Sequence, residues 1–268
     1  MKLKIIFVLL LGVAFLILPS PSFVTRAVDT PVSAHKAGEL VIDSGTVYLI
    51  EGGKRRGFPS EEEFFSHGYV FSMVLPANAQ DMKLPEGERM RMRAGSVVLD
   101  RADGITMYYL FEDGAHPFPS LTEVYMAGLE GRGYYEVDLS SYDKAAAIDF
   151  NFLYNSRPPG ALVNIDGTVF LVIAGGLAAF PSVAVFDSHG YDFAEVYYAN
   201  ELDKRLKILK NLGYRDGTLV NDNGTVFLIA EGKKYGFKTW DGFLARGHRS
   251  EFIVAGETSG YVLSGTFD

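Results

Sequence analysis

The sequence has no cysteine among its 268 residues, and it has one tryptophan and five histidines. The missing cysteines exclude disulfide bridges, thiolate metal sites and a thiol nucleophile. A chain of this length can still bury a large enough core to fold without bridges. A secreted animal module of this size would more often carry disulfides, so we expect a bacterial protein.

Recognisable catalytic motifs are also missing. The chain has no G-x-S-x-G elbow, no H-E-x-x-H pair and no phosphate-binding loop, since "GLEGRG" at 128–133 lacks a strand before it and a helix after it. The acidic run at 61–63 fits a helix start better than a glycosidase acid pair, because consecutive helical residues point in different directions. We therefore predict no enzyme activity, no catalytic residue and no cofactor, with a glycan-acting enzyme as the least favoured hypothesis.

Long apolar stretches occur only at the N-terminus, where Lys2 and Lys4 are followed by an apolar run from Ile5 to Leu18. This order is typical of a secretory signal, with cleavage after Ala27 or Ala34. An uncleaved anchor is the alternative, since a spanning helix needs about 20 apolar residues. Both readings place the remaining chain outside the cytoplasmic membrane, secreted or at the cell surface, and they assign 1–34 to the leader or anchor.

Basic side chains are the minority in the remaining chain. Removing 1–34 leaves 22 of the 25 basic and 32 of the 33 acidic side chains, a formal charge of −10. A surface of this sign disfavours nucleic acid and anionic lipid as partners. Contact with a membrane is expected only through the N-terminal segment, if it is uncleaved.

The rest of the sequence contains one pattern four times. "GTVYLIEGGKRRGFPS" in the first copy returns as "GTVFLVIAGGLAAFPS" in the third and "GTVFLIAEGKKYGFKT" in the fourth, with a more divergent second copy. Phe58, Phe118, Phe180 and Phe237 mark the same position, at spacings of 60, 62 and 57 residues. Four matches in one register indicate tandem repeats, which we place at 35–93, 94–159, 160–216 and 217–268.

Each copy predicts a three-stranded meander followed by a short helix. Two β-prone runs flank a turn such as Asp166-Gly167 or Asn223-Gly224, a third strand ends before a proline, and Ser60 with Glu63 forms a capping box. A further strand is expected after the helix, at Phe71–Leu75, Val196–Tyr198 and Phe252–Val254. The residues expected to maintain the repeat are Tyr48, Phe58, Pro59, Ser60, Gly68, Phe118, Pro119, Phe170, Phe180, Pro181, Gly190, Phe227 and Phe237.

One such unit cannot bury both faces alone, so the copies are expected to stack. The fold class predicted is mainly β with short helices, as a propeller-like or compact array of four repeats. The alternative is two α+β domains of two repeats each, divided at the Pro/Gly-rich "NSRPPG" of 155–160.

The first copy resembles a repeat of exported and cell-surface bacterial proteins, often found beside cell-wall-acting or S-layer-like modules. The match covers nearly all of the chain after the leader and is carried by Tyr48, Gly53, Phe58-Pro59-Ser60 and Tyr69. This resemblance implies a location at the cell surface. The units also resemble hemopexin-type repeats more weakly, but they have a longer period and lack the cysteine pair.

Histidine and aspartate side chains were weighed as metal ligands. His67 and His189 are equivalent residues before Gly68 and Gly190, while the other copies have Ala127 and Gly247 there, which favours a role at the helix end over a metal site. Acidic residues recur at the first turns, without the dense spacing of a calcium loop, so turn formation is favoured. Those residues are Asp43, Asp103, Asp166 and Asp222. No metal site is predicted.

Two basic strands and several aromatics are the candidate binding residues. "GKRRGF" and "GKKYGF" would share a face if the first and fourth copies were neighbours, and could bind an anionic wall polymer. A solvated strand face with edge-protecting charges is the favoured explanation. Adjacent tyrosines at 108–109, 134–135 and 197–198 must point to opposite faces, and exposed rings stack on sugars or on a partner protein. The candidates are Lys54, Arg55, Arg56, Lys233, Lys234, Tyr235 and Trp240.

These observations predict an exported, non-catalytic repeat module that binds cell-wall polymer, carbohydrate or an envelope protein. A structural or spacer subunit of a cell-surface layer is the alternative.

Overall fold

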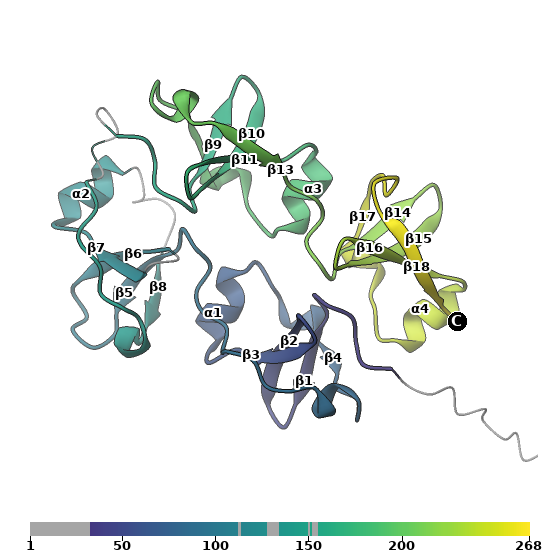
Figure 1. Ribbon diagram of the computed structural model, residues 1–268. Coiled ribbons are helices and arrows are strands. Elements are labelled where there is room, and N and C mark those ends of the chain that lie inside the picture. The colour runs from purple at the N-terminus through teal and green to yellow at the C-terminus, as the bar shows by residue number, and fades with distance from the viewer. Residues whose placement is uncertain (1–32, 112–113, 128–133, 150, 152–154) are drawn as a thin grey trace, which may run out of the picture. The chain divides into compact units, whose positions relative to one another are not determined.

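The computed structural model describes residues 33–111, 114–127, 134–149, 151 and 155–268. Ser33–Asp268 form one compact unit, and Figure 1 shows four sheet-and-helix repeats within it. The predicted signal segment up to residue 32 and the "GLEGRG" loop lie outside the described residues. The mainly β array of four repeats is confirmed, and the single compact unit favours it over two separate domains.

Among the described residues, every repeat has its own sheet and one α-helix of six residues. The first repeat contains β1 (Leu40–Asp43), β2 (Thr46–Glu51), β3 (Lys54–Gly57), α1 (Glu61–Ser66) and β4 (Leu75–Pro76). The second contains β5 (Val97–Asp100), β6 (Met107–Phe111), β7 (Gly114–Pro117), α2 (Leu121–Met126) and β8 (Tyr135–Val137). The third contains β9 (Leu162–Ile165), β10 (Thr168–Ile173), β11 (Gly176–Ala179), α3 (Val183–Ser188), β12 (Val196–Tyr198) and β13 (Ile208–Asn211). The fourth contains β14 (Leu219–Asp222), β15 (Thr225–Ala230), β16 (Lys233–Phe237), α4 (Trp240–Ala245), β17 (Ile253–Ala255) and β18 (Val262–Phe267).

The predicted meander is present in all four repeats, and the strand after the helix returns to the free edge of the first strand. In the first repeat β1 pairs antiparallel with β2 and parallel with β4. The other sheets have the same order. The helix therefore lies on a crossover between two parallel strands, which is how parallel neighbours must be connected. In the first repeat this strand is shorter than predicted, because Phe71–Met73 form a 3₁₀ turn.

A fifth strand extends the sheets of the third and fourth repeats. β13 pairs parallel with β11, and β18 pairs parallel with β16, each with a bulge at the same place. In the described part of the first two repeats, the single bridges Arg55 to Glu86 and Ala115 to Lys144 occupy the equivalent position. This strand was not predicted from the sequence.

The predicted tight turns have the expected backbone. Asp166 and Asn223 have φ of 51°, and Gly167 and Gly224 after them have φ of 87°. Two successive positive φ values are the geometry of the hairpin turn that matches the twist of paired strands. Asp43 and Asp222 instead end the first strands of their repeats, so the aspartates are not equivalent to one another.

Each helix begins at a hydroxyl side chain, as predicted for Ser60. The capping residues Ser60, Ser120, Ser182 and Thr239 all accept a hydrogen bond from an amide of the first turn. The predicted capping box is not formed in α1, because Glu63 accepts from the Ser60 hydroxyl at 2.5 Å rather than from the Ser60 amide. Gly68 and Gly190 have φ of 72° and 67°, which confirms them as left-handed residues beyond the helices.

Helix and sheet meet through one recurring aromatic contact. Phe58 packs edge-to-face on Phe64 with ring centroids 5.3 Å apart, and the third and fourth repeats have the same contact at 5.2 Å. Edge-to-face pairs add stabilisation to the apolar area that they bury. In the second repeat Phe118 packs in a cluster with Val124 instead. The phenylalanines that recur in every repeat therefore belong to the small core of each unit.

The repeats meet where glycines allow two main chains to touch. A Cβ on Gly38 would lie 1.9 Å from the carbonyl carbon of Asp216, beside Gly217, and a Cβ on Gly95 would lie 2.4 Å from the oxygen of Gly160. A Cβ on Gly68 would lie 2.4 Å from the oxygen of Gly190. The first repeat thus contacts the fourth, the second contacts the third, and the helix ends of the first and third repeats meet.

These contacts show a second, longer duplication. Gly38 and Gly160, Gly68 and Gly190, and Gly95 and Gly217 each differ by 122 positions. Adding 122 to Gly38 gives Gly160, and subtracting 122 from Gly217 gives Gly95, so the Gly38–Gly217 contact corresponds to the Gly95–Gly160 contact. The chain is accordingly a duplication of a two-repeat unit.

Candidate functional site

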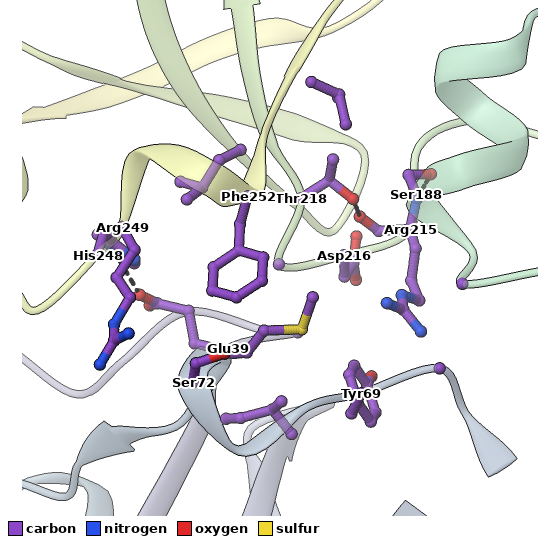
Figure 2. Close-up of a pocket in the computed structure, with 18 of the residues that line it drawn as sticks. Glu39, Tyr69, Ser72, Ser188, Arg215, Asp216, Thr218, His248, Arg249 and Phe252 are labelled. Atoms are coloured by element: carbon purple, nitrogen blue, oxygen red, sulfur yellow. Dashed lines mark hydrogen bonds and ion pairs between the residues drawn. The ribbon is translucent and has the colours of Figure 1, made fainter. Parts of the chain in front are cut away.

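A pocket of about 250 Å³ lies where the first, third and fourth repeats meet (Figure 2). The residue before β1 supplies Glu39, the segment after α1 supplies Tyr69, and the segment before β14 supplies Arg215 and Asp216. His248 and Phe252 come from the segment between α4 and β17. The pocket thus depends on contacts between repeats and cannot exist in one repeat alone.

Arg215 forms one wall of the pocket. Its Nη1 donates to the main-chain oxygen of His67 at 2.6 Å, and its guanidinium lies 4.3 Å from the centre of the Tyr69 ring. Burial lowers the pKa of Arg215, but the negative end of α1 and the face of Tyr69 compensate its charge. Arg215 therefore holds two repeats together at the edge of the pocket.

Glu39 is a buried carboxylate that lines the pocket. Its side chain is 2% exposed, Oε2 accepts from the Lys36 amide at 2.5 Å, and Oε1 lies 3.3 Å from Nε2 of His248. That second contact has poor hydrogen-bond geometry, and Oε1 has no hydrogen-bond partner among the described residues. Burial raises the pKa of Glu39, yet His248 and the other positive and donor groups around it outweigh burial and hold the pKa below its ordinary value. Glu39 is therefore a buried, ionised acceptor whose Oε1 faces His248 without a well-formed hydrogen bond.

His248 and Arg246 surround this carboxylate from the end of α4. Arg246 Nη2 lies 3.8 Å from Oε2 of Glu39, and the imidazole of His248 packs edge-to-face on Phe237 at 5.3 Å. Because the contacts shown for His248 in the described part of the chain are with Glu39 and aromatic rings, they give it no hydroxyl to activate. The Thr218 hydroxyl, also in the wall, donates to the oxygen of Arg215 at 2.5 Å. These contacts fix the imidazole of His248 and the hydroxyl of Thr218 in the wall of the pocket.

An aromatic ring and an aliphatic wall complete the pocket. Figure 2 shows the ring of Phe252 projecting into it, with Glu39 on one side and Asp216 and Arg215 on the other. Leu40, Met73, Leu75, Leu219 and Val254 supply the apolar lining. The pocket therefore combines an apolar surface with hydrogen-bonding groups of both kinds, as small-molecule sites do.

The predicted basic residues of the first repeat do not line this pocket. Arg55 pairs with Glu86 at 2.9 Å and donates to the oxygen of Met82 at 2.8 Å. Arg56 pairs with Glu51 and donates to the oxygen of Glu88 at 2.9 Å. These contacts lie within the first repeat, while Lys54 is exposed.

The predicted residues of the fourth repeat are also outside the pocket. Lys234 donates to the hydroxyl of Thr258 at 2.8 Å, and Lys233 is exposed. Tyr235 is half-buried, with the ammonium of Lys36 4.8 Å from its ring centre. Trp240 is 50% exposed and stacks on Phe243 at 4.7 Å. A shared basic face that binds an anionic polymer stays a prediction.

His67 and His189 occupy the C-cap positions of α1 and α3, but as half-buried groups with a lowered pKa rather than as cations. His67 Nε2 contacts the oxygen of Arg91 at 2.8 Å, and His189 Nε2 contacts that of Gly213 at 2.9 Å. Burial lowers the pKa of His67 to about 4, with neighbouring arginines adding to the effect. The fourth repeat has Arg246 at the equivalent capping position, not Gly247 as the sequence alignment assumed. No group of metal-ligating side chains is found among the described residues.

The adjacent tyrosines point to opposite faces, as predicted. Tyr109 is buried while Tyr108 is half-buried, and Tyr198 is 89% exposed beside half-buried Tyr197. Tyr134 is exposed beside half-buried Tyr135. Exposed rings are thus available on several repeats.

Sequence reasoning missed Glu39 and Phe252. A signal for Glu39 existed, because the residue after the first glycine of the other repeats is Ser96, Ala161 or Thr218. Only the first repeat has an acidic residue there, and it points into a buried position. Nothing in the sequence distinguishes Phe252 from the other aromatics.

Comparison with known proteins gives no family for this chain. No family model and no curated protein matches it. Among solved structures it is similar to a chain of the periplasmic assembly of the ESX-5 inner membrane complex, with 11% identity and a TM-score of 0.20, covering 87% of this chain and 67% of that one. A chain of the intact ESX-5 inner membrane complex matches with 12% identity and a TM-score of 0.20, and the match covers 87% of this chain and 58% of that one. EccB3 of the ESX-3 core complex matches with 13% identity and a TM-score of 0.17, and the match covers 87% of this chain and 98% of that one.

None of the helices in the described part of the chain is long and apolar enough to span a membrane.

Proposed function

We propose that this chain is an exported, non-catalytic module that binds carbohydrate of the cell wall in the pocket at the junction of the first, third and fourth repeats. The export part of the proposal is supported by the apolar run at 5–18 behind two lysines. The absence of recognisable catalytic motifs in the sequence favours binding over catalysis. The acidic composition argues against nucleic acid as the partner.

The observation that carries the proposal is the pairing of Phe252 with Glu39 in one pocket. A sugar ring has an apolar face that stacks on an aromatic ring, and hydroxyls around its edge that donate to carboxylates. Glu39 offers an ionised oxygen without a hydrogen-bond partner in the described structure, and Phe252 offers the ring beside it. A ligand hydroxyl would therefore satisfy a buried acceptor that is otherwise costly to leave unpaired.

The aliphatic residues of the pocket indicate which class of sugar it could bind. Met73 and Leu75 lie in the same pocket as the hydrogen-bonding groups. An N-acetylated hexosamine carries a methyl group for such a surface and an amide for polar contacts. We therefore propose an N-acetylhexosamine unit of a wall glycan as the ligand.

Isothermal titration of the full secreted chain with the soluble tetrasaccharide of β-1,4-linked N-acetylglucosamine tests the proposal. We expect binding that is weakened about tenfold or more by Glu39→Gln and by Phe252→Ala, since tenfold corresponds to about 1.4 kcal/mol. Glu86→Gln is the matched control, because Glu86 is an exposed partner of Arg55 outside the pocket. Equal weakening by the control, or no binding at all, contradicts the proposal.

A Trp240→Ala variant distinguishes sugar binding in the pocket from sugar binding on the exposed face of α4. Trp240 is exposed on α4 and was a candidate for stacking on sugar. We expect this variant to bind the tetrasaccharide as the parent chain does. Loss of binding only in this variant would transfer the site from the pocket to α4.

A structural role in a surface layer has one observation in its favour. The helices carry exposed apolar side chains four residues apart, namely Leu121 and Tyr125 on α2 and Trp240 and Leu244 on α4, all at least half exposed. Exposed apolar patches mark interaction surfaces. Sedimentation of the parent chain and of a Tyr125→Ser, Leu244→Ser variant would reveal this role as self-association that the substitutions abolish.

A further inference from the structure

We propose that the chain has two carbohydrate sites, the second being the duplicate of the Glu39 pocket in the other half of the molecule. This inference rests on the proposed function and extends it from one sugar unit to a polymer. The second site is a cavity of about 400 Å³ where the first, second and third repeats meet.

The two cavities are built from the same positions of the duplicated unit. The first is lined by Gly38, Tyr69, Ser188, Arg215 and Gly217. Subtracting or adding 122 gives the corresponding lining of the second, which is Gly160, Tyr191, Ser66, Arg93 and Gly95. The second cavity is therefore a consequence of the duplication, and not an independent gap between repeats.

The walls of the second cavity repeat the contacts of the first. Arg93 Nη1 donates to the oxygens of His189 and Gly190 at 3.1 and 3.0 Å, and its guanidinium lies 4.1 Å from the centre of the Tyr191 ring. The hydroxyl of Ser66 accepts from the Arg93 amide at 3.0 Å, as that of Ser188 does from the Arg215 amide at 3.2 Å. Both cavities thus have one arginine fixed against one tyrosine.

Both cavities contain a carboxylate and aromatic rings, but these groups come from different positions of the duplicated unit. Ala161 replaces Glu39 in the second half, and Glu195 lines the second cavity where Met73 lines the first. Glu195 lies 3.9 Å from Arg93, and its side chain is 33% exposed, so it is an accessible acceptor. Tyr135 and Tyr197 supply aromatic surface in the same cavity. A carboxylate and aromatic rings therefore meet in both sites.

The two sites lie next to each other. The oxygen of His189 accepts from Arg93 at 3.1 Å and from Arg215 at 3.5 Å, so the arginine walls of both cavities converge on one carbonyl group. A glycan long enough to extend from one cavity to the other would occupy both at once. Linked occupation of two sites raises affinity through a high effective concentration of the second unit.

Titration of the full secreted chain with the disaccharide and the hexasaccharide of β-1,4-linked N-acetylglucosamine tests this. We expect two disaccharides per chain, falling to one in Glu39→Gln and to one in Glu195→Gln. We expect one hexasaccharide per chain, bound at least tenfold more tightly than the disaccharide, and this gain is lost in either variant. Glu201→Gln, an exposed residue of the third repeat paired with Lys204, is the control and should match the parent chain.

The outcomes separate the two proposals. One disaccharide per chain, abolished by Glu39→Gln and unaffected by Glu195→Gln, overturns the second site and leaves the proposed function standing. Two disaccharides without a gain for the hexasaccharide overturn simultaneous occupation by one glycan. No heat with either sugar overturns the proposed function together with this inference. A melting temperature equal to that of the parent chain shows that each variant is folded.

Discussion

Arg215 donates from Nη1 to the main-chain oxygen of His67 at 2.6 Å, although 148 positions separate the two residues. Arg93 makes the equivalent contact with His189 at 3.1 Å. Each arginine thus closes the end of a helix in the opposite half of the chain. The positive side chain satisfies carbonyl groups that the helix leaves free, and it favours the negative end of the helix dipole.

Replacing Arg215 should therefore weaken the contact between the halves. We expect Arg215→Met to lower the free energy of unfolding by about 3 kcal/mol, because a charged hydrogen bond and a cation–π contact are lost together. Denaturant unfolding measures this. Arg205→Met is the control, since Arg205 is an exposed residue of the third repeat. Equal loss in both variants would contradict a special role for Arg215.

The glycine contact at the helix ends gives a second prediction. Gly68→Ala should cost about 3 kcal/mol or more, because the new Cβ would lie 2.4 Å from the Gly190 oxygen and the backbone is left-handed. Gly45→Ala is matched in its left-handed backbone, with no atom within 4 Å of the Cβ, and should cost only about 1–2 kcal/mol. Thermal unfolding of both variants compares them. Equal costs would show that the close approach itself has no energetic consequence.

The buried carboxylate of Asp203 gives a third prediction about stability. Asp203 is fully buried and accepts hydrogen bonds from the Arg157 amide at 2.7 Å and the Asn200 amide at 2.9 Å, besides its ion pair with the Arg157 guanidinium. Asp203→Asn should cost about 3–5 kcal/mol by leaving the largely buried guanidinium of Arg157 without its counterion. Asp166→Asn at an exposed turn should be almost neutral. Chemical denaturation distinguishes them, and a neutral Asp203→Asn would refute the argument.

His67 makes stability dependent on pH. Its folded pKa of about 4 lies below the ordinary 6.5, so between these values the unfolded chain binds more protons than the folded one. The free energy of unfolding should therefore fall as the pH drops from about 6.5 towards 4. The loss should be on the order of 2 kcal/mol, since partial exposure of the ring reduces the effect.

His67→Gln should flatten this part of the pH profile while keeping a side-chain hydrogen-bonding group at the helix end. Urea unfolding at a series of pH values measures the slope for the parent chain and the variant. An NMR titration of the parent would also show the His67 imidazole uncharged at pH 5. An unchanged slope in the variant, or titration near 6.5, would disprove the assignment.

Much of each repeat was predictable because its determinants are local. The hairpin turns follow from residue pairs such as Asn223-Gly224, whose backbone angles depend on their own side chains. The helix starts follow from hydroxyl residues such as Ser60 and Ser182, which act on amides two or three positions away. The fifth strands were not predictable, since β18 pairs with β16 across an irregular segment and its exposed residues follow no clear alternation.

By itself, the sequence determined that this protein is a set of four β-rich units, because turns, caps and the aromatic contact of each unit involve residues close together in the chain. Only the tertiary structure decided which units meet and where a ligand could bind. Gly38 with Gly217 and Glu39 with His248 are brought together by packing across about two hundred positions, and no local preference of the chain encodes such a distance. The pocket belongs to the contacts between repeats, so its residues could be recognised only after those contacts were known.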